Sequence, residues 1–208
     1  MVALVCGLML TASAWTQGDL KLMHFGFEQA AQVVSRYEFN VYENGAGVYL
    51  ERATGESAQK PDAGIRVSPA TLATIFAAKD AVSADRCGTK MKNVADTGAK
   101  TLEYFAGGVK SSCVFHYSDD AKVRDADAAF MAMAETLQMG EQLAHERRFD
   151  RLGLDATLDS LIDEVKGGRA IEVQNIAPVL QGIVGDERLM ERVRSKAAHL
   201  LESASMAK

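Results

Sequence analysis

The feature that most constrains the fold is a long apolar stripe in residues 118–148. Apolar and small residues recur there with the spacing of one helix face. Ser118 is a suitable N-cap, and Asp119 and Asp120 would lie in the positively polarised first turn. We therefore predict one long helix with this stripe facing a sheet. The stripe consists of Val123, Ala126, Phe130, Met133, Leu137, Gly140 and Ala144.

Before that helix, the spacing of apolar residues changes to that of a β-hairpin. Residues 18–35 are loosely amphipathic, and we expect them to be helical near their end. In residues 37–42 apolar and polar side chains alternate, as they do in a strand. Asn44-Gly45 follows, a strong two-residue hairpin signal because both positions tolerate a positive φ. A return strand is expected through Leu50.

A capped helix and a second hairpin are predicted next. Residues 64–67 form a short strand, and Ser68-Pro69 then supplies an N-cap followed by proline at the first helical position. Residues 100–105 and 110–117 have strand spacing and are separated by a glycine pair, which predicts a hairpin. The buried face of the Ser68 helix is expected to consist of Leu72, Ile75, Phe76 and Val82.

The start of the chain resembles a secretory signal. An apolar run, Val2–Leu10, precedes the small residues 12–14, although a positively charged start is missing. The run is too short to span a bilayer as a helix. We expect cleavage, with a mature chain from near Trp15; the alternative is a buried N-terminal helix.

Cleavage would leave two cysteines, Cys87 and Cys113, in an exported chain. Such a pair is expected to form a disulfide in an oxidising compartment. A zinc site needs four ligands, and a thiol-redox centre usually has its cysteines two residues apart. Both alternatives are less favoured than a structural disulfide.

Composition excludes some classes of partner. Apolar residues make up 48% and charged residues 25% of the 208 residues, as in ordinary globular proteins of one domain or two small ones. The formal net charge is −5, and no run of Lys and Arg is longer than two. We therefore expect no nucleic-acid binding and, after signal removal, no integral membrane segment.

Three short motifs suggest chemistry that their surroundings do not support. Residues 96–99 match the Asp-Thr-Gly-Ala of aspartic proteases, but that chemistry needs two carboxylates sharing a proton, so we interpret the segment as a turn. Residues 97–101 lack the Gly-Lys-Ser/Thr ending of a phosphate loop. Glu141 and His145 have the spacing of a metal pair on one helix face, but two ligands do not make a site.

His116 supplies the enzymatic alternative. A small hydrolase would use His116 with Asp96, Asp119 or Asp120, although no G-x-S-x-G motif is present. A solvent-facing histidine on a strand is the simpler interpretation. We accordingly predict no catalytic residue, no metal ligand and no cofactor.

Met131, Met139 and Leu143 form a second apolar strip on the long helix. Methionine-rich strips can serve as adaptable protein-binding surfaces. The strip could equally be covered by the C-terminal helices, with the first stripe facing the sheet. Both interpretations remain open at this stage.

Residues 175–201 resemble a single HEAT-type helical hairpin. The resemblance is carried by Pro178 in the first helix, Asp186 in the turn, and residues 193–194 and 197–198 in the second helix. The middle of the chain resembles uncharacterised secreted bacterial domains, which place a strand hairpin, a Ser-capped helix and a cysteine-bearing hairpin before a long helix. These resemblances imply a binding or scaffolding role and transfer no catalytic residue.

The predicted fold is α+β: two antiparallel β-hairpins packed on a capped helix and a long amphipathic helix, followed by an all-helical C-terminal subdomain. The expected divisions are a signal peptide (1–14), an N-terminal segment (15–35), an α+β domain (36–148) and a helical subdomain (149–208). The expected function is non-enzymatic: a secreted or periplasmic module that binds another envelope protein or acts as a scaffold.

Overall fold

The structure is a computed structural model that describes residues 20–29, 34–53, 62–90 and 98–206. It is α+β, as the sequence predicts. Its elements are β1 Leu22–Glu28, β2 Val34–Tyr42, β3 Ala46–Ala53, β4 Ala63–Arg66, α1 Pro69–Ala77, α2 Lys79–Ser83, β5 Ala99–Ala106, β6 Val109–Phe115, α3 Ala121–Phe149, α4 Leu154–Lys166, the 3₁₀ turn η1 Val173–Ile176, α5 Ala177–Val184 and α6 Glu191–Met206.

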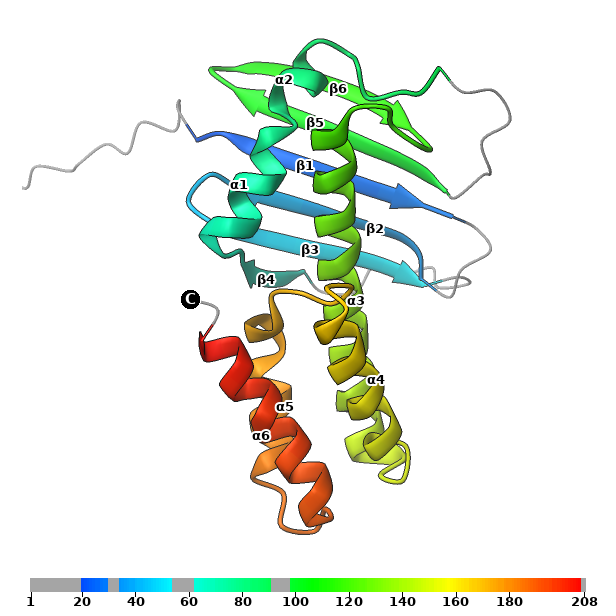
Figure 1. Ribbon diagram of the computed structural model, residues 1–208, viewed down its shortest axis with the longest axis vertical. Coiled ribbons are helices and arrows are strands. Elements are labelled where there is room, and N and C mark those ends of the chain that lie inside the picture. Colours follow the sequence, from blue (N-terminus) through cyan, green and yellow to red (C-terminus); the bar gives the residue numbers. More distant parts are fainter. Residues whose placement is uncertain (1–19, 30–33, 54–61, 91–97, 207–208) are drawn as a thin grey trace, which may run out of the picture.

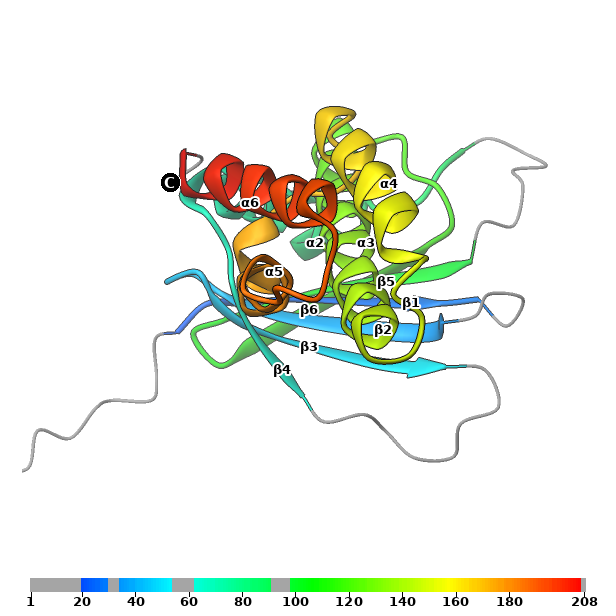
Figure 2. The same cartoon turned by 90° about the horizontal axis from the view of Figure 1, so that it is seen from below.

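All six strands form one antiparallel sheet in the order β4-β3-β2-β1-β5-β6. Helices α1 and α3 lie across the same face of this sheet (Figure 1). Seen from below, the C-terminal helices lie on that side as well (Figure 2). Both predicted hairpins, β2–β3 and β5–β6, are present, and β1 joins them into a continuous sheet.

The expectation of a helix near the end of residues 18–35 is wrong for the part of this segment that the structure describes. It forms β1 and the start of β2. Along β1, Met23, Phe25 and Phe27 are buried on the helix-covered face, in strict alternation with their neighbours. Strand β1 pairs with β2 on one side and β5 on the other, so its backbone groups find partners across the sheet. That pairing overrides a weak local helical tendency.

The hairpins close in two different ways. In the β5–β6 hairpin, which is the second, Gly107 and Gly108 both have positive φ, +56° and +75°, as a two-residue turn between twisted strands requires. In the first, residues 43–45 all lie in the loop, and only Gly45 has a positive φ, +77°. The Gly45 N–H donates to the Tyr42 carbonyl at 2.9 Å. The Asn-Gly signal therefore located the hairpin correctly, but the loop is longer than two residues.

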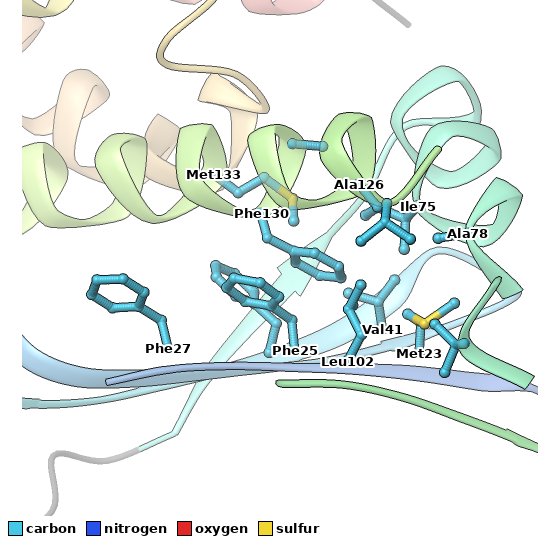
Figure 3. Close-up of a cluster of buried hydrophobic side chains, with 14 of the residues drawn as sticks. Met23, Phe25, Phe27, Val41, Ile75, Ala78, Leu102, Ala126, Phe130 and Met133 are labelled. Carbon is cyan, nitrogen blue, oxygen red and sulfur yellow. The ribbon is translucent and has the colours of Figure 1, made fainter. Parts of the chain in front are cut away.

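The core of the sheet layer is aromatic. The Phe130 ring of α3 stacks on Phe25 of β1, with centroids 4.7 Å apart and planes 6° from parallel (Figure 3). Phe39 of β2 lies 5.5 Å from the Phe130 ring. All three side chains are fully buried. Burying aromatic rings of this size is a dominant contribution to a core, so Phe130 is the main link between α3 and the sheet.

One predicted helix start is confirmed and one is corrected. Ser68 caps α1, with its Oγ accepting from Thr71 N–H, and Pro69 is the first helical residue. Helix α3 is capped by Asp120 rather than Ser118: the Asp120 carboxylate accepts from the N–H groups of Lys122 and Val123. A carboxylate at this position can accept from both N–H groups and also suits the helix dipole.

Helix α3 takes part in two hydrophobic clusters. Its first half, from Val123 to Met133, packs on the sheet, and its second half packs on the C-terminal helices. Gly140 lies where η1 crosses α3, and a Cβ there would overlap the Ile176 side chain. Five residues of the predicted stripe are buried, Leu137 and Ala144 are half-buried, and only the first half of the stripe faces the sheet.

The C-terminal segment is helical, as predicted, and is hydrogen-bonded to the sheet layer. The Asn175 side chain accepts from Arg66 N–H at 2.7 Å and donates to the Arg66 carbonyl at 2.9 Å, which pairs the backbone of edge strand β4. The Glu172 carboxylate accepts from the Ser68 N–H at 3.0 Å and the Ser68 hydroxyl at 2.6 Å. These contacts tie η1 to both β4 and the start of α1.

The last helix begins later than its sequence pattern suggests. Residues 187–203 together have the sequence pattern of one helix, but α6 begins at Glu191. The Asp186 carboxylate accepts from the Arg188 N–H at 3.2 Å, which stabilises a turn in place of the first helical turn.

Candidate functional site

A pocket of about 510 Å³ opens at the end of the helical layer away from the sheet. The turns α3–α4 and α5–α6 both lie at this end (Figure 1). We call it the arginine pocket, because four of the residues that line it are arginines. Its lining residues are Ala144, Arg147, Arg148, Arg151, Pro178, Val179, Asp186 and Arg188.

Local sequence explains how these arginines come together. Arg147 and Arg148 occupy the last turn of α3, where cations are favoured by the helix dipole. Arg151 follows in the α3–α4 turn, and Arg188 lies in the turn before α6. Gly182 of α5 packs directly under the Arg147 guanidinium, and a Cβ there would overlap it. Glycine at this position therefore leaves room for the Arg147 guanidinium against α5.

Asp186 is the single acidic residue that lines the pocket, and it is 6% exposed. Its two oxygens accept from Arg188 Nε and Nη2, each at 2.9 Å, in a bidentate pair. Arg147 Nε lies 3.6 Å from the same carboxylate. The hydrogen bonds from Arg188 are the largest cause that holds the pKa of the Asp186 carboxyl well below its usual range. Asp186 is therefore ionised at neutral pH and organises two of the four guanidinium groups.

Replacing Asp186 with asparagine should remove a contribution to stability that depends on pH. Since the folded-state pKa is lowered, the ionised carboxylate stabilises the fold above about pH 4, the ordinary range of an aspartate in an unfolded chain. That contribution is lost as the pH falls further. The Asp186→Asn variant should be less stable than the parent at pH 7, and the difference should narrow towards pH 3 in thermal unfolding monitored by circular dichroism.

Asp163→Asn is the matched control for this measurement. Asp163 is exposed on α4, and its nearest cation, Lys166, is 3.9 Å away. Exposed pairs of this kind contribute little to stability. A pH-dependent loss as large in the control as in Asp186→Asn would contradict the role assigned to Asp186.

Arg148 and Arg151 differ from Arg147 and Arg188, which lie within ion-pair distance of Asp186. Arg148 and Arg151 are exposed, and neither forms an ion pair within the part of the chain that the structure describes. Exposed apolar side chains are close to the pocket arginines in sequence: Phe149, 75% exposed, follows Arg148, Leu152, 84% exposed, follows Arg151, and Met190, 45% exposed, comes two residues after Arg188. We call the combined area the tip surface. It consists of Arg148, Phe149, Arg151, Leu152, Arg188 and Met190.

Sequence reasoning missed this site. Arg147 and Arg148 lie at the end of the predicted long helix, where the structure also has them. No role was predicted for Arg151 or Arg188, which lie in the α3–α4 and α5–α6 turns. The available signal was a pair of arginines, Arg148 and Arg151, each followed by a large apolar residue at a position where the helix ends. The contribution of Arg188 could not be seen, because it comes from a turn 36 residues beyond Leu152.

The predicted disulfide is present. Cys87, which follows α2, is bonded to Cys113 of the edge strand β6, with their Cα atoms 6.0 Å apart. Both cysteines are buried within the sheet-layer cluster. The bond links the segment after α2 to the edge of the sheet, which agrees with the structural role predicted for it.

The structure describes three of the four residues of the hydrolase alternative, His116, Asp119 and Asp120. His116 Nδ1 lies 3.0 Å from the Gly98 carbonyl. The Asp119 carboxylate accepts from the Thr89 hydroxyl and the Lys90 N–H, each at 2.8 Å, while Asp120 caps α3. Asp96 lies outside the described residues. The described acidic groups near His116 thus bind backbone and hydroxyl donors.

The second strip on α3 is divided between two environments. Met139 and Leu143 are buried in the cluster formed with the C-terminal helices. Met131 is exposed, and its sulfur accepts a hydrogen bond from the Tyr37 hydroxyl at 2.6 Å. Within one chain, the C-terminal helices therefore cover two of the three residues proposed for protein binding.

A second group of buried polar side chains lies between the sheet and α3. Lys100 Nζ pairs with Asp127 at 2.6 Å, and burial raises the pKa of the Asp127 carboxyl. The Tyr49 hydroxyl donates to Glu51 at 2.8 Å and accepts from Gln138 at 3.3 Å. Burial also raises the pKa of the Tyr49 hydroxyl, which keeps it protonated as a donor. These contacts join β3 and β5 to α3, and we assign them a structural role.

The described residues lack both a metal site and a membrane-spanning helix. They contain no group of three or more His, Cys, Asp or Glu side chains arranged to hold a metal ion, and this includes Glu141 and His145. None of the helices among them is both long and apolar enough to cross a membrane.

The fold defines an α+β protein with a six-stranded antiparallel sheet covered on one face by helices. Neither a model of a known protein family nor a curated protein matches this chain. We therefore infer the function from the exposed residues of the protein itself.

Proposed function

We propose that this protein is a non-enzymatic extracytoplasmic module that binds another protein through the tip surface. The observation that carries the proposal is the exposure of Phe149, Leu152 and Met190, each within two residues in sequence of an arginine that lines the arginine pocket. Aromatic residues, methionine and arginine are enriched at protein interfaces, and Trp, Tyr and Arg most often supply most of the binding energy. Large apolar side chains grouped on a surface with a polar border indicate an interaction site.

The extracytoplasmic location is supported by the cysteines. Cys87 and Cys113 are bonded to each other. Disulfides of this structural kind persist in oxidising compartments and are rare in reducing ones. The apolar run at the start of the chain, with its small residues at 12–14, supports export in the same direction.

The non-enzymatic assignment is supported by how the candidate acids and bases are used. Asp119 and Asp120 hold a loop segment and a helix terminus, respectively. The arginine pocket is lined by guanidinium groups, one carboxylate and apolar side chains. Such a lining binds and orients charged groups, and both oxygens of its one carboxylate accept hydrogen bonds from Arg188.

The test places a photo-crosslinking amino acid at Leu152 or Met190 in cells that export the protein. Val109 is the control position, since it is an exposed apolar residue at the turn of the β5–β6 hairpin, away from the tip surface. We expect crosslinks to the same distinct protein from both tip positions and none to it from Val109. A serine at Phe149 should weaken those crosslinks.

Several outcomes would contradict the proposal. Crosslinks of equal yield from Val109 would show that the contact is not specific to the tip surface. Products containing lipid, or a second copy of this chain, would assign the tip surface to a membrane or to self-association. A complete absence of crosslinks at both tip positions would also count against the proposal.

A further inference from the structure

The charge of the arginine pocket is opposite in sign to that of the protein as a whole. The chain carries 28 acidic and 23 basic residues, a formal net charge of −5. The pocket is lined by four arginines and one aspartate. Asp150 and Glu187 are its neighbours in sequence but do not line it, and Asp150 instead accepts from the Gly153 N–H at 3.4 Å. A concentrated positive charge on an acidic protein favours an anionic partner.

The chemical class of the anion that would bind here can be inferred from the cations that line the pocket. All four cations that line the pocket are guanidinium groups, and none is a lysine. The planar fork of arginine matches a carboxylate with two parallel hydrogen bonds. The pocket already contains one such pair, in which Arg188 holds both oxygens of Asp186 at 2.9 Å. A carboxylate is therefore a group that this arrangement of side chains binds.

Two arginines remain for a partner. Arg147 and Arg188 are engaged by Asp186, whereas Arg148 and Arg151 form no ion pair with any residue in the described ranges. In sequence, Arg148 and Arg151 are each followed by an exposed apolar residue, Phe149 and Leu152. A ligand for this area must therefore offer negative charge and apolar surface close together.

We infer that the bound partner presents an acidic segment with apolar side chains, whose carboxylates pair with Arg148 and Arg151 at the arginine pocket. This inference rests on the proposed function, which it deepens by naming the chemistry of the partner. An acidic protein segment fits better than an anionic membrane, because the arginines line a pocket between α3 and α5, which a side chain can enter and a broad membrane surface cannot.

The experiment measures the binding of a fluorescent peptide of alternating glutamate and phenylalanine by anisotropy. A peptide with glutamine in place of glutamate is the uncharged comparison. The test variant is R148Q/R151Q, and the matched control is K79Q/R86Q, which removes the same charge from two exposed residues of the α2 region. We expect affinity for the acidic peptide to fall about tenfold in the test variant and to stay unchanged in the control.

Salt provides an independent readout. Binding of the acidic peptide to the parent should weaken as the ionic strength rises above about 0.15 M, and this dependence should be smaller in R148Q/R151Q. Equal affinity for the two peptides, or equal losses in the test and control variants, would overturn the inference. Binding to anionic vesicles through the same arginines, without binding to the peptide, would overturn it in favour of a membrane.

The two proposals can fail separately. If the crosslinks form but neither peptide charge nor the arginines matter, the tip surface binds a protein through its apolar residues alone. If the crosslinks do not form, the proposed function fails whatever the peptide does. Circular dichroism of both charge variants checks that they are folded, as expected for changes at exposed side chains.

Discussion

Replacing Phe130 with alanine should lower the free energy of unfolding by about 3–5 kcal/mol. Phe130 is 0% exposed, and its ring stacks on Phe25 at 4.7 Å and lies 5.5 Å from Phe39. Removing the ring would leave a cavity where α3 crosses the centre of the sheet, and packed strands can only partly fill such a space. Urea unfolding followed by circular dichroism measures the change.

Phe149→Ala is the matched control, with the same chemical change on the same helix. Phe149 ends α3 and is 75% exposed, so its replacement should alter stability by less than about 0.5 kcal/mol. Comparing Phe130→Ala with Phe149→Ala also separates effects on stability from effects on binding, because Phe149 belongs to the tip surface. Comparable losses in the two variants would contradict the placement of Phe130 at the centre of the core.

Loss of the disulfide is the second change for which we expect a large effect. The bond between Cys87 and Cys113 closes a loop with a sequence separation of 26 residues. In the chain-entropy model, a loop of this length restricts the unfolded chain enough to stabilise the fold by about 3–4 kcal/mol. The C87A/C113A variant should show a loss of this order in urea unfolding.

Reduction provides a test of the same prediction without mutation. Dithiothreitol should destabilise the parent protein and leave C87A/C113A unaffected, since the variant has no bond between these positions to break. An equal response of both proteins would mean that the reductant acts elsewhere. A loss below about 1 kcal/mol would indicate that packing of Cys87 in the core already holds the segment in place.

Elements with strong local signals could be predicted from the sequence. The Ser68 cap with Pro69, the glycine pair of the second hairpin and the apolar stripe of α3 each depend on residues a few positions apart. The alternation of buried residues along β2 was also correct. Local propensity, turn chemistry and periodicity all agree at these positions, which makes such elements predictable.

Strand β1 could not be recognised in this way. Its buried residues alternate, but they are interrupted by His24 and Gly26 and lead into a segment with helical tendency. The strand is specified by its neighbours, with Phe25 opposite Phe39 on one side and Leu102 on the other. Strand preference depends mainly on such packing between strands, which one segment of sequence does not contain.

The N-cap residue of α3 could not be identified from the sequence either. Ser118, Asp119 and Asp120 are all acceptable caps, and the sequence alone does not rank them. In the structure the Asp119 carboxylate accepts from the Thr89 hydroxyl and the Lys90 N–H, and the Ser118 hydroxyl accepts from the Asp120 N–H. Hydrogen bonds to residues far back in the sequence thus occupy Asp119, and Asp120 is the cap.

The amino-acid sequence by itself determined the α+β class, the two hairpins, the long helix, the helical C-terminal segment and the pairing of Cys87 with Cys113. These properties follow from periodicity, turn residues and a count of cysteines. Tertiary structure alone decided the strand order and the gathering of Arg148, Arg151 and Arg188 around one pocket. Strand pairing and the approach of α5 to α3 depend on hydrogen bonds and packing between segments that are far apart in the chain. The combined free energy of these contacts cannot be read from a local sequence pattern.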